Sequence, residues 1–167
     1  MTRAQKKWAA RDESWPAAWG WLFPATYAVH IVEELWGGAG FVAWFARIAG
    51  VELTAGQFLL WNVLALLLMS ASIVLTMRFK RLRWLLIAYG ATFLLNALSH
   101  LIASIYTISY SPGMLSGLLL WMPLGAFTLL RFGKTLSSRA RRAGLLVGAL
   151  MHCVVLLLTL LGERLHV

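Results

Sequence analysis

The chain contains one apolar run in which ionisable side chains cluster, residues 17–36, AAWGWLFPATYAVHIVEELW. A helix of about 20 residues crosses the ~30 Å hydrocarbon core of a bilayer. An acidic residue near the centre of such a helix costs about 2.5–3.5 kcal/mol, so His30, Glu33 and Glu34 need compensation. At about 100° per residue, all three project from one helix face about 100° wide. This pattern predicts one intramembrane polar site; in the plainer interpretation the glutamates simply end the helix at the interface.

Four further apolar runs of similar length follow this one. They occupy residues 56–77, 84–107, 113–130 and 143–161. Hydrophobic residues make up 60% of the 167 residues and the mean hydropathy is +0.76, which is more apolar surface than a small soluble core can bury. The runs are continuous rather than alternating, which favours helices over strands. The sequence predicts an all-α, polytopic membrane helical bundle of about five transmembrane helices plus a short interfacial helix.

The predicted organisation has a basic cytoplasmic segment at 1–16, one bundle domain at 17–161 and a short tail at 162–167. A basic start before an apolar run also resembles a signal peptide, but this run carries ionisable residues and lacks a clear small-residue cleavage site. We therefore expect a retained first helix. The single cysteine, Cys153, lies in the last run and provides neither a disulfide framework nor a thiol cluster for metal.

The formal net charge of +9 is distributed unevenly along the chain. A nucleic-acid-binding surface would be one explanation for such a charge. The basic residues instead gather in three segments on one side of a five-span bundle, and only Arg47 and Arg164 lie on the other side. The clustered residues are Arg3, Lys6, Lys7, Arg11, Arg78, Lys80, Arg81, Arg83, Arg131, Lys134, Arg139, Arg141 and Arg142. The positive-inside rule then predicts a cell (inner) membrane protein with a cytoplasmic N-terminus, an outer C-terminus and no nucleic-acid partner.

A short amphipathic helix is expected between the first and second runs. Apolar residues recur at i, i+3, i+4 and i+7 from Phe41 to Ile48, after a glycine-rich turn. With Arg47 toward water, this helix would lie on the outer membrane surface, either as a lid over the site or as a plain interfacial anchor. Thr54 and Gln57 have the spacing of a capping box, which predicts where the next helix starts.

The third run carries the second polar constellation, a stripe about four turns long. Its members are Thr92, Asn96, Ser99, His100 and Thr107. Counted at ~1.5 Å per residue from the outer boundary, His30, Asn62 and His100 all lie ~9–10 Å deep. Asn96 lies ~16 Å deep on the same count. Three helices thus offer polar groups at similar depth, which predicts a pocket between them in the outer half of the bilayer.

The fourth and fifth runs carry turn and packing signals. Ser111 suits a helix N-cap and Pro112 the first helical position, while Pro123 predicts a kink. Two glycine pairs with small-xxx-small spacing predict close helix packing and leave a homo-oligomer open. These pairs are Gly113 with Gly117 and Gly144 with Gly148. His152 lies in the middle of the last run, and the sequence leaves open whether it joins the site.

Three short motifs occur in order along the chain, HIVEE at residues 30–34, NALSH at 96–100 and YSPG at 110–113, and together they resemble the HXXEE family of small multi-span membrane proteins. Residues 30–34, HIVEE, resemble its signature, and residues 96–100, NALSH, resemble its N-x-x-x-H motif. Residues 110–113, YSPG, resemble its short segment containing Pro-Gly. The resemblance covers roughly residues 19–123, and the three motifs in order are more specific than any one alone. It implies a multi-span membrane protein suspected of being an enzyme, without naming a substrate.

The sequence favours an intramembrane enzyme acting on a lipid-like or small hydrophobic substrate, among membrane lipids. The predicted catalytic residues are His30, Glu33, Glu34 and His100. The residues predicted to orient the substrate are Asn62 and Asn96. In one version His30, His100 and one of the two glutamates, with Glu34 favoured over Glu33, bind a divalent metal (zinc, iron or manganese), which suits a hydrolase or an oxidoreductase. In the other no metal binds, and two carboxyl groups act as acid and base, as in an isomerase.

Two other classes of function stay open. A proton- or ion-coupled transporter would use the same carboxylates to bind and release an ion. The outer-half position of the site and the lack of a visible inverted repeat weigh against it. A structural or partner-binding membrane subunit would use the polar groups only to lock the bundle.

Overall fold

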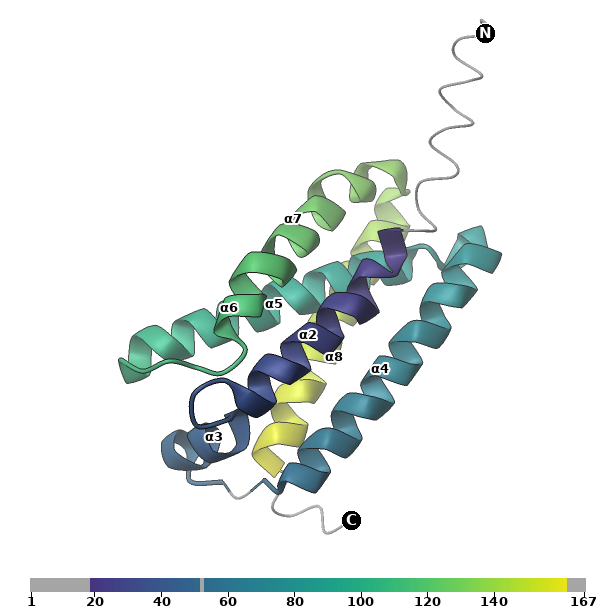
Figure 1. Ribbon diagram of the computed structural model, residues 1–167. Coiled ribbons are helices and arrows are strands. Elements are labelled where there is room, and N and C mark those ends of the chain that lie inside the picture. The colour runs from purple at the N-terminus through teal and green to yellow at the C-terminus, as the bar shows by residue number, and fades with distance from the viewer. Residues whose placement is uncertain (1–18, 52, 162–167) are drawn as a thin grey trace, which may run out of the picture.

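The computed structural model describes residues 19–51 and 53–161 of the chain (Figure 1). Every regular element in these ranges is a helix, so the all-α prediction is confirmed. The predicted basic segment at 1–16 and the tail at 162–167 lie outside the described residues. The domain boundaries therefore stay predictions.

The helices follow one another with short connections. In chain order they are α2 (Leu22–Trp36), α3 (Phe41–Ala49), α4 (Ala55–Arg78), η1 (Lys80–Leu82), α5 (Trp84–Thr107), α6 (Met114–Ser116), η2 (Gly117–Trp121), α7 (Met122–Leu130), η3 (Phe132–Thr135) and α8 (Ser138–Leu161). The short η1 and η3 are 3-10 turns, whereas η2 is a π-helical turn.

Among the described residues, four helical stretches are long and apolar enough to cross a membrane. They are Ala55–Arg78, Lys80–Thr107, Met114–Thr135 and Ser138–Leu161. These stretches match the second to fifth apolar runs of the sequence. The first run begins outside the described residues, and its described helix, α2, has 15 residues. The helices agree with an integral membrane protein, and the count of five spans and the orientation of the termini stay predictions.

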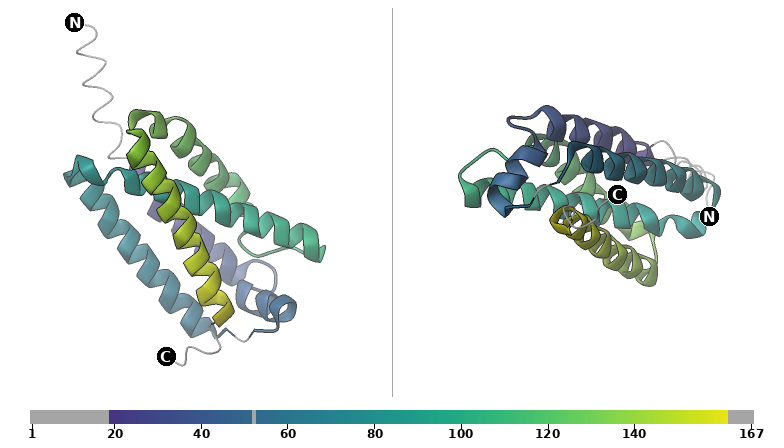
Figure 2. Two further views of the ribbon diagram at one scale, coloured as in Figure 1. Left: turned by 180° about the vertical axis from the view of Figure 1, so that it is seen from behind. Right: turned by 90° about the horizontal axis from the view of Figure 1, so that it is seen from below.

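Helix α5 is central to the bundle, with α7 and α8 packed on it (Figures 1 and 2). Gly144 and Gly148 bring α8 close, because a Cβ on Gly148 would stand 2.5 Å from the carbonyl oxygen of Ala88. On α7, a Cβ on Gly125 would stand 2.7 Å from the carbonyl oxygen of Gly90. The predicted close helix packing at Gly144 and Gly148 is therefore confirmed within the chain, while the homo-oligomer stays a prediction.

The main apolar core contains a buried aromatic cluster between α2, α5 and η2. Phe23, Phe93 and Trp121 are all buried, and the last two stack with their ring centroids 4.0 Å apart. The π-helical turn η2 comes just before Pro123, which has no N–H to donate to the preceding turn. The irregularity predicted near Pro123 takes the form of this turn, which ends on Trp121.

Helix α3 is the predicted short amphipathic helix. Its Trp44 is buried and donates its indole N–H to Oγ of Ser109 at 3.0 Å. The capping box at the start of α4 is confirmed: Gln57 N–H donates to Thr54 Oγ1, and Thr54 N–H donates to Gln57 Oε1, each at 3.1 Å. In Figure 1, α3 lies at the end of the bundle beyond Trp36, where α2 ends.

Candidate functional site

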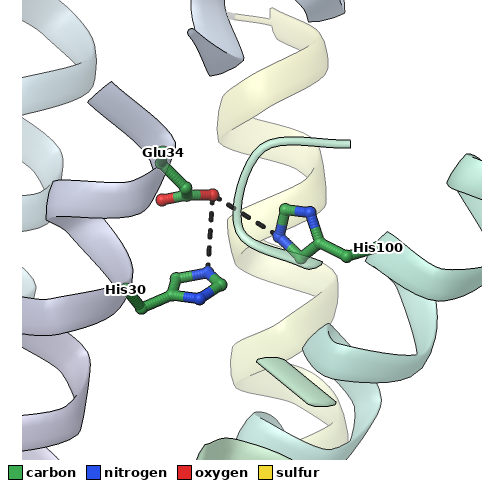
Figure 3. Close-up of side chains that lie close together, drawn as sticks. All are labelled: His30, Glu34 and His100. Atoms are coloured by element: carbon green, nitrogen blue, oxygen red, sulfur yellow. Dashed lines mark ion pairs between the residues drawn. The ribbon is translucent and has the colours of Figure 1, made fainter. Parts of the chain in front are cut away.

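Helix α2 presents two of its three ionisable side chains to the interior. His30 and Glu34 are buried one turn apart, so Nε2 of His30 lies 3.5 Å from Oε1 of Glu34. His100 of α5 approaches the same oxygen, with its Nε2 at 3.4 Å (Figure 3). The potential ligand atoms of these three residues all lie within 4.8 Å of one another. We name His30, Glu34 and His100 the triad.

A serine hydroxyl holds the second ring nitrogen of each histidine in the triad. Nδ1 of His30 lies 2.8 Å from Oγ of Ser116, and Nδ1 of His100 lies 2.9 Å from Oγ of Ser111. Both serines are buried. Partners of this kind fix the orientation and tautomer of histidines that bind metals. Both rings are therefore held with Nε2 toward Glu34.

The hydrogen bonds of Ser116 assign the proton on His30. The serine hydroxyl donates to the carbonyl oxygen of Gly113 at 3.4 Å, because a carbonyl can only accept. With the hydroxyl proton on that carbonyl, Nδ1 of His30 is the donor to Oγ of Ser116, and Nε2 is the nitrogen left facing Glu34. That nitrogen is buried and forms no hydrogen bond within the described part of the chain. Nε2 of His30 and the carboxylate oxygen of Glu34 can therefore share a proton or bind a metal cation.

Gly113 closes the triad on the loop side. Its φ of +97° lies in the left-handed region that glycine tolerates and other residues rarely adopt. A Cβ at this position would stand 2.8 Å from Cε1 of His30 and 2.9 Å from Cε1 of His100. The loop backbone thus packs directly on both imidazole rings, and a larger residue would displace them.

Aromatic rings contact the triad on its other sides. The indole of Trp121 stacks on His30, with centroids 3.7 Å apart and the planes inclined by 26°. Phe41 of α3 meets His100 edge to face at 5.9 Å. These rings keep bulk water from the triad, and electrostatic interactions are stronger where water is excluded.

Glu33 points away from the triad and forms hydrogen bonds with the loop between α5 and α6 and with the start of α6. Its carboxylate accepts hydrogen bonds from the hydroxyl of Tyr110 and from the backbone N–H groups of Leu115, at 2.8 Å, and Ser116, at 2.6 Å. Burial and the bond to Glu33 raise the pKa of Tyr110, so the phenol stays protonated at neutral pH. Glu33 therefore satisfies free amides at the start of α6 and holds the segment that carries both serines.

A cavity of about 630 Å³ adjoins the triad, and both predicted orienting residues line it. The amide of Asn62 is already engaged, since it accepts from the hydroxyl of Tyr27 at 2.7 Å and donates to the carbonyl of Phe58 at 2.9 Å. The side-chain amide of Asn96 forms no hydrogen bond with another described residue. Of the two, Asn96 is the one free to meet a bound molecule.

His152 of α8 lies in the same cavity but outside the triad. Its Nε2 lies 3.0 Å from Oγ of Ser99, whose hydroxyl donates to the carbonyl of Leu95 at 3.0 Å. His152 thus hydrogen-bonds to Ser99 and lines the cavity without belonging to the triad.

The three sequence motifs meet in this site. HIVEE supplies His30 and Glu34, NALSH supplies His100, and YSPG supplies Ser111 and Gly113. The model of the family described as "Protein of unknown function with HXXEE motif" matches residues 21–128. The chain belongs to the HXXEE family. The matched region contains the whole triad and both serines, so the centre described above lies within the HXXEE part of the chain. No curated protein and no solved structure matches this sequence.

The predicted N-cap at Ser111, with Pro112 as the first helical residue, is wrong. Helix α6 begins at Met114, after Gly113, and no side-chain cap forms there. Ser111 instead binds His100, and Ser116 and Trp121 join the site without having been expected there. A signal for the serines does exist in residues 111–116, SPGMLS, where two hydroxyls flank the glycine.

Proposed function

We propose that this HXXEE protein is a membrane-embedded, metal-dependent enzyme that hydrolyses an ester or amide bond in a lipid-like substrate, with zinc as the favoured metal. The triad residues would hold the ion. The observation that carries the proposal is the convergence of two histidine Nε2 atoms on one carboxylate oxygen. Catalytic zinc sites use such sets of three protein ligands and keep a fourth position open.

The spacing of the triad favours a metal over shared protons. A hydrogen bond between a charged nitrogen and a carboxylate is about 2.7–2.9 Å long. The two contacts to Glu34 are longer, at 3.5 and 3.4 Å. Ligands at about 2.0–2.2 Å from a tetrahedral ion lie roughly 3.3–3.5 Å from one another. The two contacts to Glu34 fall in this range.

A bound divalent ion would polarise a carbonyl oxygen and make water a stronger nucleophile. The residues of the chain prepare the site for that chemistry. Ser111 and Ser116 fix the two rings, Trp121 and Phe41 exclude bulk water, and the free amide of Asn96 can donate to the substrate oxygen. Glu33 contributes indirectly, by holding the loop.

Metal analysis of the purified full-length protein tests the proposal. The wild type should bind one ion per chain, and His30→Ala and His100→Ala should lose it. His152→Ala is the matched control, because His152 is a buried histidine of the same cavity outside the triad and its loss should leave the metal in place. In parallel, lipid esters and amides should be cleaved by the wild type and not by Glu34→Gln.

Two outcomes separate the alternatives. Wild-type protein that takes up no zinc, iron or manganese would overturn the metal-dependent proposal and leave the metal-free acid–base version. Two histidines and one carboxylate also suit Fe(II) in oxygenases, so a protein that selects iron over zinc would overturn hydrolysis in favour of oxidation.

A further inference from the structure

The cavity beside the triad has a buried back wall and exposed edges. Its lining residues on α2 and α5 are buried or half-buried, and His30 and Phe93 are among the buried ones. Those on α4 and α8 include side chains with large exposed fractions, 71% for Leu68 and 63% for Leu150. The cavity therefore opens sideways, between α4 and α8.

This opening faces the surroundings of the bundle. Helix α8 packs mainly on α5, whereas α4 packs mainly on α2 (Figure 2). Both helices contribute lining residues, so they border the cavity from different sides. Both helices belong to the stretches that are long and apolar enough to cross a membrane. In a bilayer, the neighbours of such a lateral opening are hydrocarbon chains of lipids.

The dimensions of the cavity match one lipid chain. Its lining extends along α4 from Phe58 to Met69 and along α8 from Val147 to Thr159. At ~1.5 Å per residue these stretches are about 16–18 Å long. Half of the ~30 Å hydrocarbon core, the share of one leaflet, is about 15 Å. The volume also falls within the roughly 300–1,000 Å³ of ligand pockets.

The chemistry of the lining indicates an amphiphile. Around the triad, α2 and α5 contribute most of the polar groups, whereas α4 and α8 contribute mainly leucine, valine and other apolar residues. Among the described residues, the lining includes no lysine or arginine to neutralise a phosphate. This lining suits an uncharged carbonyl at the triad and a hydrocarbon chain along α4 and α8.

We infer that the substrate is a membrane lipid that enters sideways between α4 and α8 and places one acyl chain in the cavity, with its ester or amide carbonyl at the triad. The cleavage step rests on the proposed function, whereas the binding of the acyl chain in the cavity does not depend on a metal. Hydrolysis adds one water: its oxygen bonds to the carbonyl carbon as the bond to the leaving oxygen or nitrogen breaks. The leaving atom takes a proton, which gives a fatty acid and an alcohol or amine.

Photolabelling in nanodiscs tests where the chain lies. The full-length protein would be reconstituted with a phospholipid carrying a diazirine in one acyl chain, and labelled residues would be mapped by mass spectrometry. Ala65→Trp and Val155→Trp fill the cavity from α4 and α8. Leu67→Trp and Leu157→Trp are matched controls on the same helices, since these two exposed leucines do not line the cavity.

Wild type and controls should be labelled at cavity positions, and the filling variants should lose this labelling several-fold while keeping their metal. His100→Ala should lose the metal and keep the labelling, which separates a failure of the metal proposal from a failure of this one. Unchanged cavity labelling in Ala65→Trp and Val155→Trp would overturn the inference. If a branched isoprenoid probe labelled the cavity residues and the acyl probe did not, the assignment of the bound group as an acyl chain would be wrong.

Discussion

The backbone of Gly113 lies against the imidazole of His30, so closely that a Cβ on the glycine would stand 2.8 Å from Cε1 of the ring. The loop before α6 therefore packs directly on the triad, and the positions of the two are coupled. A change that lifts this loop must also move the histidine, even when the ring itself is untouched.

Gly113→Ala should therefore weaken metal binding at least tenfold and lower the melting temperature. The change forces a side chain into a left-handed conformation, at about 1–2 kcal/mol, and onto both rings. Gly50→Ala is the matched control, because Gly50 also has a positive φ but no atom lies within 4 Å of the added Cβ. Zinc titration and thermal unfolding would be compared for both variants. Equal zinc affinities would contradict the contact between loop and triad.

Ser116→Ala and Ser111→Ala should each weaken metal binding by about 10–100-fold, the usual effect of losing a partner that orients a histidine ligand. Ser70→Ala is the control, because this hydroxyl only donates to the carbonyl of Leu66 within its own helix, at 2.8 Å. Competition with a chelator of known affinity measures the change. Affinities equal to that of Ser70→Ala would mean that the serines do not orient the rings.

Glu33→Gln should destabilise the fold by about 1–3 kcal/mol while part of the metal is kept. In the wild type, two carboxylate oxygens accept hydrogen bonds from Tyr110, Leu115 and Ser116. Glutamine has only one oxygen to accept them, and its N–H₂ group would face other donors and leave them unsatisfied. Thermal unfolding and metal content would be measured on the same sample. A variant with unchanged stability and no metal would show that Glu33 is itself a ligand.

Tyr110→Phe should lose a pH-dependent contribution to stability. The pKa of Tyr110 is raised in the folded chain, first by burial and then by Glu33, so the folded state favours the protonated phenol. That contribution is fully present below the ordinary tyrosine pKa of about 10 and is lost as pH rises toward the folded value. The difference in melting temperature between wild type and Tyr110→Phe should therefore be constant from pH 7 to about 9 and shrink above about 10. A difference that grows in alkali would contradict this.

A reporter fused after Val167 should be active on the outer side of the membrane, and one fused before Met1 on the cytoplasmic side. The reason is the clustering of basic residues in three segments, which the positive-inside rule places in the cytoplasm. Paired fusions with alkaline phosphatase and a fluorescent protein measure both ends. A C-terminus found in the cytoplasm would rule out five spans.

Composition and periodicity were enough to predict the helices, because a long apolar run can satisfy its backbone in hydrocarbon only as a helix or a closed barrel. Within the site, the i, i+4 relation between His30 and Glu34 follows from helix geometry alone. Counting residues from the helix ends placed His30 and His100 at one depth, and the structure joins them through Glu34.

The remainder of the site could not be read from spacing. Glu33 is adjacent to Glu34, yet its partners come from the loop around Tyr110 and from α6, and only the folded loop shows which way it turns. Ser116 reaches His30 across 86 positions of sequence. Trp121 lies against the same ring where the π-helical turn ends, and no propensity rule predicts that turn from sequence.

The distance along the chain between the two halves of the triad has a consequence for biosynthesis. Glu34 leaves the ribosome 66 positions before His100. At about 5–20 residues per second, this interval lasts roughly 3–13 s. Throughout it, Glu33 and Glu34 lack the partners from α5 and the loop that hold them in the folded protein. During this interval the two carboxylates of α2 must be stabilised by other surroundings, such as water or lipid headgroups, because the histidine of α5 and the serines of the loop and α6 have not yet been synthesised.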